Sequence, residues 1–423
     1  MKSKILMCMM AMAAFAALAV PPRLTGQTSY SVGTLDDLGG TAGQANSINN
    51  RSWATGIANL PGDQSGHAML WANGSKLDLG TLGGPNSGVF WPVKNNRGLI
   101  AGIAETPDAN LLGEKWSCSA FFPSVTGNIC LGFVWQNGVM TPLPTLGGYN
   151  GYATGANNIG QVVGWAENTV HDPTCTGRGQ VLQFRAVIWG PQNGQIQELP
   201  PLPGDTVSAA TAINDKGQVV GISGICDQAV GRRSAIHAVL WENGIPIDLG
   251  NIGGDAWNTP TAINNHGTIV GFANQSPGTA GSFEAFIWTK EGGMKPLGAI
   301  GDDPLSLAFG INDKNQVVGL SIGGPYGSRA FLWDVVMTDL NTLTVPGSAY
   351  LLYANDINDR AEIVGEAFDP NTNEAPGYVA IPSPAGAQVS EAPRVGGNAS
   401  GKLELPEKVR QQLRQRFGRA LQD

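Results

Sequence analysis

The stretch that decides the fold is Ala212-Ile213-Asn214-Asp215-Lys216-Gly217-Gln218-Val219-Val220-Gly221. It combines an Asn-Asp turn, a glycine two residues after the aspartate, and a valine pair that ends at a second glycine. Asx followed by glycine is typical of tight hairpin turns, because glycine adopts positive φ without strain. Valine favours strands. The stretch therefore predicts two short strands joined by a tight turn.

The same pattern recurs seven times along the chain. Each copy begins with an asparagine followed by Asn or Asp, and a glycine stands seven residues after that asparagine. The asparagines are Asn49, Asn95, Asn157, Asn214, Asn264, Asn312 and Asn358. A third segment ends in tryptophan in six copies, as in His237-Ala238-Val239-Leu240-Trp241, and a fourth ends in Asp-Leu-Gly. Four short strands about every 50 residues, seven times over, predict an all-β, seven-bladed β-propeller.

Two glycine positions of the repeat carry separate expectations. We expect the glycine that closes each pattern, such as Gly221, to mark a bulge or a close approach between neighbouring sheets. The turn glycine is replaced by Asn315 in one copy, and asparagine tolerates the left-handed region. Ser52 and Ala361 fit that position less well, so we expect their turns to differ.

The last copy lacks its fourth strand before the chain turns polar. A matching Asp-Leu-Gly segment stands at the other end of the chain, in residues 30–40. We expect this segment to pair beside the strand near Tyr378 to Ile381 and so to close the ring. The alternative is an open β-solenoid, which would need caps at its ends.

These motifs together resemble the HAF family of bacterial extracellular repeats. The resemblance rests on His67-Ala68-Met69-Leu70-Trp71, the Ile-Asn-Asp turns and Asp78-Leu79-Gly80, and it covers roughly residues 30 to 382. The histidine becomes Gly132, Arg185, Glu284 or Arg329 in other copies. The resemblance implies export and a repeat architecture, and it supplies no catalytic residue.

Composition agrees with a strand-rich globular protein and excludes some partners. Of 423 residues, 59 are glycine and 27 proline, 42% are hydrophobic and only 14% charged. The chain is therefore not a disordered tract. The formal net charge is -8, and nucleic acid is excluded as a partner because binding it requires a basic face.

The N-terminus carries an export signal. Lys2 and Lys4 precede an apolar run over 5–18, and Ala17-Leu18-Ala19 forms a cleavage pattern. We assign residues 1–27 to the signal peptide and the region around the cut. No second apolar stretch of about 18 residues follows. We expect a mature protein that is secreted or periplasmic and has no transmembrane segment.

The C-terminus departs from the repeat. Residues 383–401 are rich in Pro, Ala, Gly and Ser and predict a flexible linker. Residues 402–423 predict a short amphipathic helix, with an apolar residue every fourth position from Leu405 to Leu421 and a basic polar side. This helix is either a docking or membrane-surface element or a tail without such a role.

Four cysteines remain in the mature chain. Cys118 and Cys130 fall in one insertion, so we pair them, which leaves Cys175 with Cys226 across adjacent blades. Four cysteines allow three pairings, and the sequence does not choose among them. Four separate thiols are the alternative to disulfides in an exported chain.

Function is expected where the repeats differ. Large insertions at 103–131, 166–183 and 222–236 lie between the second and third strands of blades two to four. They bring four candidate binding residues, Trp116, Arg178, Arg232 and Arg233, to one off-centre face. We expect the ligand there, and not on the opposite face where the Asx turns gather. The alternatives are that the loops have no binding role and that Trp116 packs beneath its own loop.

The blade connections on the same face supply carboxylates. Asp205, Asp255, Asp302 and Asp303 should lie near the central channel, where they could hold a cation such as calcium or a basic ligand. They could equally be Asx-turn residues. We expect no cofactor and no zinc site, since the chain has no His-x-x-x-His pair and no calcium, nucleotide or hydrolase motif.

Two functional classes follow. The first is a secreted, non-catalytic propeller that binds a protein, glycan or envelope component through the loops of blades two to four. The second is a polysaccharide-active propeller enzyme that uses paired carboxylates. An enzyme should present an acid and a base with perturbed pKa values in one open pocket, whereas a binder should present an aromatic or polar surface without such a pair. The charge-poor repeats favour binding.

Overall fold

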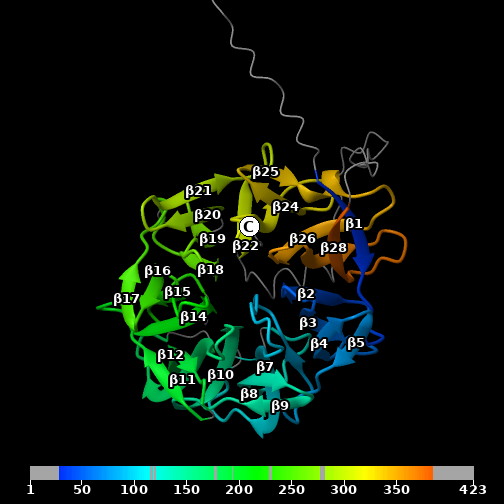
Figure 1. Ribbon diagram of the computed structural model, residues 1–423. Helices are drawn as coiled ribbons and strands as arrows, with labels where there is room; N and C mark the ends of the chain where they lie inside the picture. The colour runs from blue at the N-terminus through cyan, green and yellow to red at the C-terminus, as the bar shows by residue number, and fades with distance from the viewer. Residues whose placement is uncertain are drawn as a thin grey trace, which may run out of the picture.

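Seven four-stranded antiparallel sheets stand around a central axis as the blades of a β-propeller, as the sequence predicts (Figure 1). The computed structural model describes residues 28–383 apart from 115–117, 119–120, 176–178, 193, 228–230 and 277–281. The expected signal segment, linker and C-terminal helix lie outside the described residues. No helix within the described ranges is long and apolar enough to cross a membrane.

Each blade runs outward from the axis, with its first strand innermost and its fourth at the rim (Figure 1). Blade one contains β2 (Gly43–Ile48), β3 (Ala54–Asn59), β4 (Gly66–Ala72) and β5 (Ser75–Asp78), and blade two contains β6 (Ser87–Gly88), β7 (Ile100–Ala109), β8 (Asn128–Gln136) and β9 (Val139–Pro142). Blade three contains β10 (Gly147–Ala156), β11 (Val162–His171), β12 (Leu182–Trp189) and β13 (Ile196–Leu199), and blade four contains β14 (Val207–Ile213), β15 (Val219–Gly224), β16 (His237–Glu242) and β17 (Ile245–Asp248). Blade five contains β18 (Thr259–Ile263), β19 (Ile269–Asn274), β20 (Phe283–Thr289) and β21 (Gly293–Gly298). Blade six contains β22 (Leu305–Ile311), β23 (Val317–Ile322), β24 (Arg329–Asp334) and β25 (Val336–Asp339), which the short 3-10 helix η1 (Leu340–Leu343) follows.

Blade seven is completed by the N-terminal strand. It contains β26 (Tyr350–Ile357), β27 (Ile363–Phe368), β28 (Gly377–Ser383) and, at its edge, β1 (Ser29–Thr34). β1 is antiparallel to β28, with Ser31 opposite Ile381. Tyr30 of β1 is fully buried in the core that blades six and seven share. The predicted ring closure is confirmed, with the pairing confined to the first residues of the 30–40 segment.

The glycine that closes each repeat lies opposite a β-bulge in the first strand of its own blade. In blade four the strand pairing shifts between Ala210 and Ala212, next to Gly221. Equivalent shifts occur in five other blades. A Cβ atom on Gly221 would lie 2.1 Å from the carbonyl oxygen of Ala209, which is impossible without movement of the backbone. Of the two predicted explanations, the bulge is therefore the one that the structure shows.

The turns at Ser52 and Ala361 do not differ from the glycine turns, so that expectation is wrong. Ser52 and Ala361 have φ values of 59° and 60°, in the same left-handed region as Gly217 at 75°. Each N–H donates to the carbonyl oxygen of the turn asparagine, at 3.1 Å for Ser52 and 2.9 Å for Ala361. The asparagine side chain imposes this conformation, because Asn358 Oδ1 also accepts the N–H groups two and four residues later.

The first asparagine of each turn also joins its blade to the next. Asn214 Oδ1 accepts the N–H groups of Lys216 and Gln218, both at 3.0 Å, and its Nδ2 donates to the carbonyl oxygen of Asn264 at 3.0 Å. The same inter-blade bond recurs in all seven blades, at 2.6 to 3.1 Å. The asparagines thus form a closed ring, and the position requires a side chain with both an acceptor and a donor.

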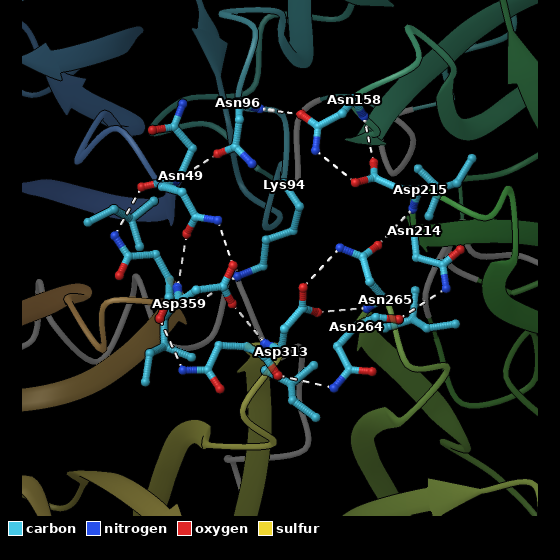
Figure 2. A pocket seen from close by; sticks show the side chains of 18 residues that line it. Asn49, Lys94, Asn96, Asn158, Asn214, Asp215, Asn264, Asn265, Asp313 and Asp359 are labelled. Atoms are coloured by element: carbon cyan, nitrogen blue, oxygen red, sulfur yellow. Dashed lines mark hydrogen bonds between the residues drawn. The ribbon is translucent and has the colours of Figure 1, made fainter.

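The second Asx residue of each turn forms another closed ring around the axis (Figure 2). The backbone N–H of Asn158 donates to Asp215 Oδ1 at 2.8 Å, and that of Asp215 donates to Asn265 Oδ1 at 3.0 Å. Bonds of 2.7 to 3.0 Å continue through all seven blades. Each of these bonds needs only a side-chain oxygen, which explains why both Asn and Asp occur at this position.

Candidate functional site

The second strands of blades two and three are longer than their counterparts. β7 and β11 each have 10 residues, whereas β15 and β19 each have six. The additional residues belong to the predicted insertions, on the face opposite the Asx turns. The hairpins β7–β8 and β11–β12 therefore project beyond the loops of the other blades.

Two disulfides fix these insertions, in the predicted pairing. Cys118 bonds to Cys130 within blade two, with a Cα–Cα distance of 5.3 Å. Cys175 bonds to Cys226 and so joins the loops of blades three and four, with a Cα–Cα distance of 4.8 Å. Both distances lie within ordinary disulfide reach. One disulfide thus fixes the insertion of blade two, and the other cross-links the insertions of blades three and four.

Three exposed aliphatic side chains lie on the projecting hairpins. Leu111 is 81% exposed and Val125 is 62% exposed in the blade two insertion, and Val170 is 49% exposed on β11. Glu114, three residues after Leu111, accepts the N–H groups of Val181 and Leu182 in the blade three hairpin, at 2.9 and 2.7 Å. The two insertions are therefore in direct contact, and both carry exposed apolar side chains.

Two of the four loop residues predicted to bind a ligand, Trp116 and Arg178, lie outside the described residues. Arg232 is exposed on the blade four insertion, and Arg233 is half-buried. The backbone N–H of Arg233 donates to the carboxylate of Asp227 at 3.0 Å. Of the four loop residues predicted to bind a ligand, Arg232 is therefore the one that is both described and exposed.

The predicted carboxylates do not form one cluster. Asp205 accepts the Ser223 hydroxyl at 2.6 Å and lies 2.9 Å from His237 Nδ1. This hydrogen bond raises the pKa of His237. Asp303 in blade six makes the matching contact, at 2.7 Å from Arg329 Nη2. The repeat position that holds His237 in blade four and Arg329 in blade six thus contacts an acid of its own blade.

The other two predicted carboxylates, Asp255 and Asp302, are exposed. Within the described ranges, the group of potential metal ligands that lie close together is Glu105, Cys118 and Cys130. The two sulfur atoms of that group are joined in a disulfide, so they are not thiolate ligands. The donor set therefore does not fit a metal ion, and none of the four predicted aspartates belongs to it.

A pair of buried carboxylates clamps the two hairpins together. The side-chain amide of Gln180 lies 3.3 Å from Glu114 Oε1 and 2.9 Å from Glu167 Oε1. Glu167 also accepts the N–H of Asn150 at 2.8 Å, and both glutamates are buried. Burial, with the nearby Glu114 carboxylate, raises the pKa of Glu167 to about 7. Sequence reasoning missed this pair, because its members stand 53 residues apart.

The stability contribution of Glu167 should depend on pH. Its pKa is raised from 4.5 to about 7 on folding, so its contribution is complete below about pH 4.5 and is lost as the pH rises through 7. We expect the wild-type melting temperature to fall between pH 5.5 and 8, and Glu167→Gln to reduce that fall by a few degrees. Differential scanning calorimetry at both pH values measures the difference.

The control is Glu198→Gln, which removes a carboxylate that is 45% exposed and lies 3.0 Å from Arg185. This variant should keep the wild-type dependence on pH. Equal dependence in wild-type and Glu167→Gln proteins would contradict the assignment of this carboxylate as the titrating group.

Blade two also places aromatic residues after its short innermost strand β6, which ends at Gly88. The carbonyl oxygen of Val89 accepts Asn46 Nδ2, and Val93 exchanges hydrogen bonds with Ser47 Oγ. Phe90, Trp91 and Pro92 thus form a three-residue bulge beside Asn46, which is itself the single bulge residue of blade one. Phe90 and Trp91 are half-buried against an aromatic cluster beside both disulfides. Sequence reasoning missed them. Their signal is an aromatic run where the other copies have mostly small or polar residues.

The axis opens on the Asx-turn face into a pocket with an empty volume of about 460 Å³ (Figure 2). Its walls are the Asx rings and the isoleucines that precede them in five blades. Lys94 replaces isoleucine in blade two, and its ammonium reaches past blade one to bind the carboxylate of Asp356 and the carbonyl oxygen of Ile357. Burial raises the pKa of Asp356, and Lys94 opposes this rise.

The ring carboxylates in this pocket are already engaged. Asp215, Asp313 and Asp359 each accept one backbone N–H and one side-chain N–H from neighbouring turns. The pocket is thus built from groups that hold the blades together. This arrangement agrees with the prediction that the Asx-turn face serves the scaffold.

No family model matches the chain, and no curated protein matches it. Among solved structures, acylaminoacyl peptidase of Pyrococcus horikoshii matches with a TM-score of 0.47 at 11% identity, over 84% of this chain and 52% of that one. The Trypanosoma rangeli sialidase matches with a TM-score of 0.35 at 11% identity, over 83% and 57%. Porphyromonas gingivalis dipeptidyl peptidase 4 matches with a TM-score of 0.30 at 8% identity, over 78% and 44%. The chain thus spans about half the length of these proteins, and the likeness concerns the fold alone.

Proposed function

We propose that this protein is an exported, non-catalytic binding module that holds a protein partner on the loop face of blades two to four. The observation that carries the proposal is the exposure of three aliphatic residues, Leu111, Val125 and Val170, on the hairpins of blades two and three, each of which is held by a disulfide. Apolar side chains at the tips of rigid loops contribute contact area at low entropic cost, which favours a protein surface as the partner. Arg232 lies on the same face and would orient an anionic group of that partner.

The alternative, a polysaccharide-active enzyme, has less support. The carboxylates with raised pKa values on this face are Glu105 and Glu167. Glu105 is fully buried and bonded to Asn86 and Thr126, and Glu167 is fully buried in the hairpin clamp. Hydrolysis of a glycosidic bond requires an acid and a base that both reach the substrate. These carboxylates act in the packing of the loops.

Export remains part of the proposal. Two disulfides are consistent with an oxidising compartment, such as the periplasm or the extracellular medium. The expected signal over residues 1–27 supplies the route. Detection of the mature chain in the periplasmic or culture fraction, with both disulfides formed, tests this point.

Charged substitutions on the hairpin tips should abolish partner binding. We expect Leu111→Asp combined with Val170→Asp to lower affinity at least tenfold, because two carboxylates would be desolvated at the interface. The measurement is a binding screen against purified envelope and extracellular proteins, with glycans and a polysaccharide-degradation assay in parallel.

The matched control is Ile245→Asp, which introduces the same charge at a rim residue that is 66% exposed on β17. This variant should bind normally, and all variants should keep the wild-type melting temperature. Partner binding that survives the double substitution would remove the loop face as the site, and degradation of a polysaccharide would favour the enzyme instead.

A further inference from the structure

The three-residue bulge of blade two is held rigidly at both ends. The carbonyl oxygen of Val89 accepts Asn46 Nδ2 at 3.0 Å, and the N–H of Val89 donates to the carbonyl oxygen of Gly56 at 3.2 Å. At the other end, the N–H of Val93 donates to Ser47 Oγ at 2.8 Å, and that hydroxyl donates back to the carbonyl oxygen of Val93 at 3.1 Å. Residues 90–92 are therefore presented by blade one as a fixed loop.

The aromatic rings of this loop are preorganised. Phe90 folds back over Gly88, whose added Cβ would lie 2.5 Å from the ring. The Phe90 ring also lies 5.8 Å from the ring of Phe121 and 5.9 Å from that of Phe122, which flank the Cys118–Cys130 disulfide region. Trp91 packs against the same cluster and remains partly exposed. Little conformational entropy would be lost when a ligand stacks here.

Trp91 also offers a hydrogen-bond donor. Among the described residues, none accepts a bond from its indole N–H, and this nitrogen is not one of the buried unsatisfied atoms, so at least part of its surface is open to solvent. By contrast, Trp71, Trp189 and Trp241 of the third strands donate to backbone carbonyl oxygens at 2.7 to 2.8 Å. Trp91 thus combines an accessible ring with an accessible donor.

The surroundings of the loop are neutral. Residues 86–93 contain no charged side chain. Two charged residues next to this segment already have partners. Glu105 is bonded to Asn86 and Thr126, and Lys94 is bonded to Asp356. A charged ligand would therefore lose its hydration without gaining an ionic partner. A neutral ring with C–H groups on its face and hydroxyls at its edge matches both the stacking surface and the donor.

We propose that the Phe90-Trp91-Pro92 loop is a binding site for a sugar ring of a neutral saccharide, which stacks on Trp91 and accepts a hydrogen bond from its indole N–H. This site is separate from the protein-binding surface at Leu111 and Val170. It lies in the loop that follows the innermost strand of blade two, and either site can therefore fail without the other.

Isothermal titration with neutral hexasaccharides of glucose, mannose and N-acetylglucosamine tests this site. We expect one of them to bind with a Kd below about 1 mM. Trp91→Ala should weaken that binding about tenfold, and Trp91→Phe should give an intermediate affinity, because it keeps a stacking face and loses the donor. Leu111→Asp with Val170→Asp should leave saccharide binding unchanged.

The control is Trp53→Ala, on the Asx-turn face, where the Arg51 guanidinium lies 5.7 Å from the Trp53 ring. This variant should bind the saccharide as the wild type does. The proposal is overturned if none of the hexasaccharides binds, if Trp91→Phe and Trp91→Ala both bind as tightly as the wild type, or if Trp53→Ala weakens binding equally.

Discussion

Removal of residues 28–40 should lower the melting temperature of the chain by about 10 °C or more. The deletion takes away β1, all of its pairing with β28 and the buried ring of Tyr30. It also exposes the edge of β28, whose N–H and carbonyl groups then lack partners. For a chain of this size each kcal/mol corresponds to a few degrees, so the loss of a whole strand gives a large shift. Circular dichroism melting of chains that start at residues 28 and 41 measures it.

A peptide added in trans provides the control for this deletion. A synthetic peptide of residues 28–40 should raise the melting temperature of the truncated chain, whereas the same composition in scrambled order should not. The truncated chain should also self-associate through its free edge, which analytical ultracentrifugation detects. Identical melting of the two chains would show that β1 does not close the ring.

Gly221→Ala should destabilise the protein by about 3 kcal/mol, near the upper end of the usual cost of overpacking. The added methyl group would lie 2.1 Å from the carbonyl oxygen of Ala209 and 2.8 Å from the Cα atom of Ala210. Both neighbours are backbone atoms, so the bulge itself must move and its inter-strand bonds must be disturbed. Urea unfolding followed by tryptophan fluorescence measures the change.

Gly33→Ala is the matched control, since it makes the same change in a strand. There the nearest atom to the added methyl group is Val379 Cγ1, at 3.9 Å, and Gly33 is exposed. We expect a change within about 0.5 kcal/mol. If both variants unfold at the same urea concentration, the repeated glycine is not required by the bulge.

The blades could be predicted because the information that specifies them is local and repeated. Asn214, the turn that follows it and the glycine seven residues later recur in every copy, at intervals of 46 to 62 residues, so one copy explains the others. The last copy lacks a fourth strand, and residues 30–40 contain the Asp-Leu-Gly segment that ends this strand in other copies. The pairing of Cys118 with Cys130 followed from their place in one insertion, and the structure confirms it.

The long, asymmetric loops could be located from the sequence, but their contacts and exposure could not be predicted. Insertion lengths identified blades two to four, whereas the contact between Glu114 and Glu167 depends on how two hairpins fold against each other. The exposure of Leu111 likewise follows from where a hairpin ends in space. Trp91 was hidden because the spacing of 46 residues between Asn49 and Asn95 is not unusual, although the segment from Gly84 to Asn95 is two residues longer than the equivalent segment from Gly40 to Asn49 in blade one. Such features arise from tertiary packing, which a periodic pattern does not encode.

The Asx rings and the Lys94–Asp356 pair respond differently to a change in the number of blades. Every ring bond joins the same atoms of one copy to the next, so a gene duplication that added a copy would still offer each turn a partner on both sides. The ion pair instead links the second copy to the seventh across the first. An additional copy inserted next to the first copy would separate the lysine from its aspartate and leave a buried charge uncompensated, whereas one inserted elsewhere would leave the pair intact. This contact therefore marks the position of the first copy in the ring.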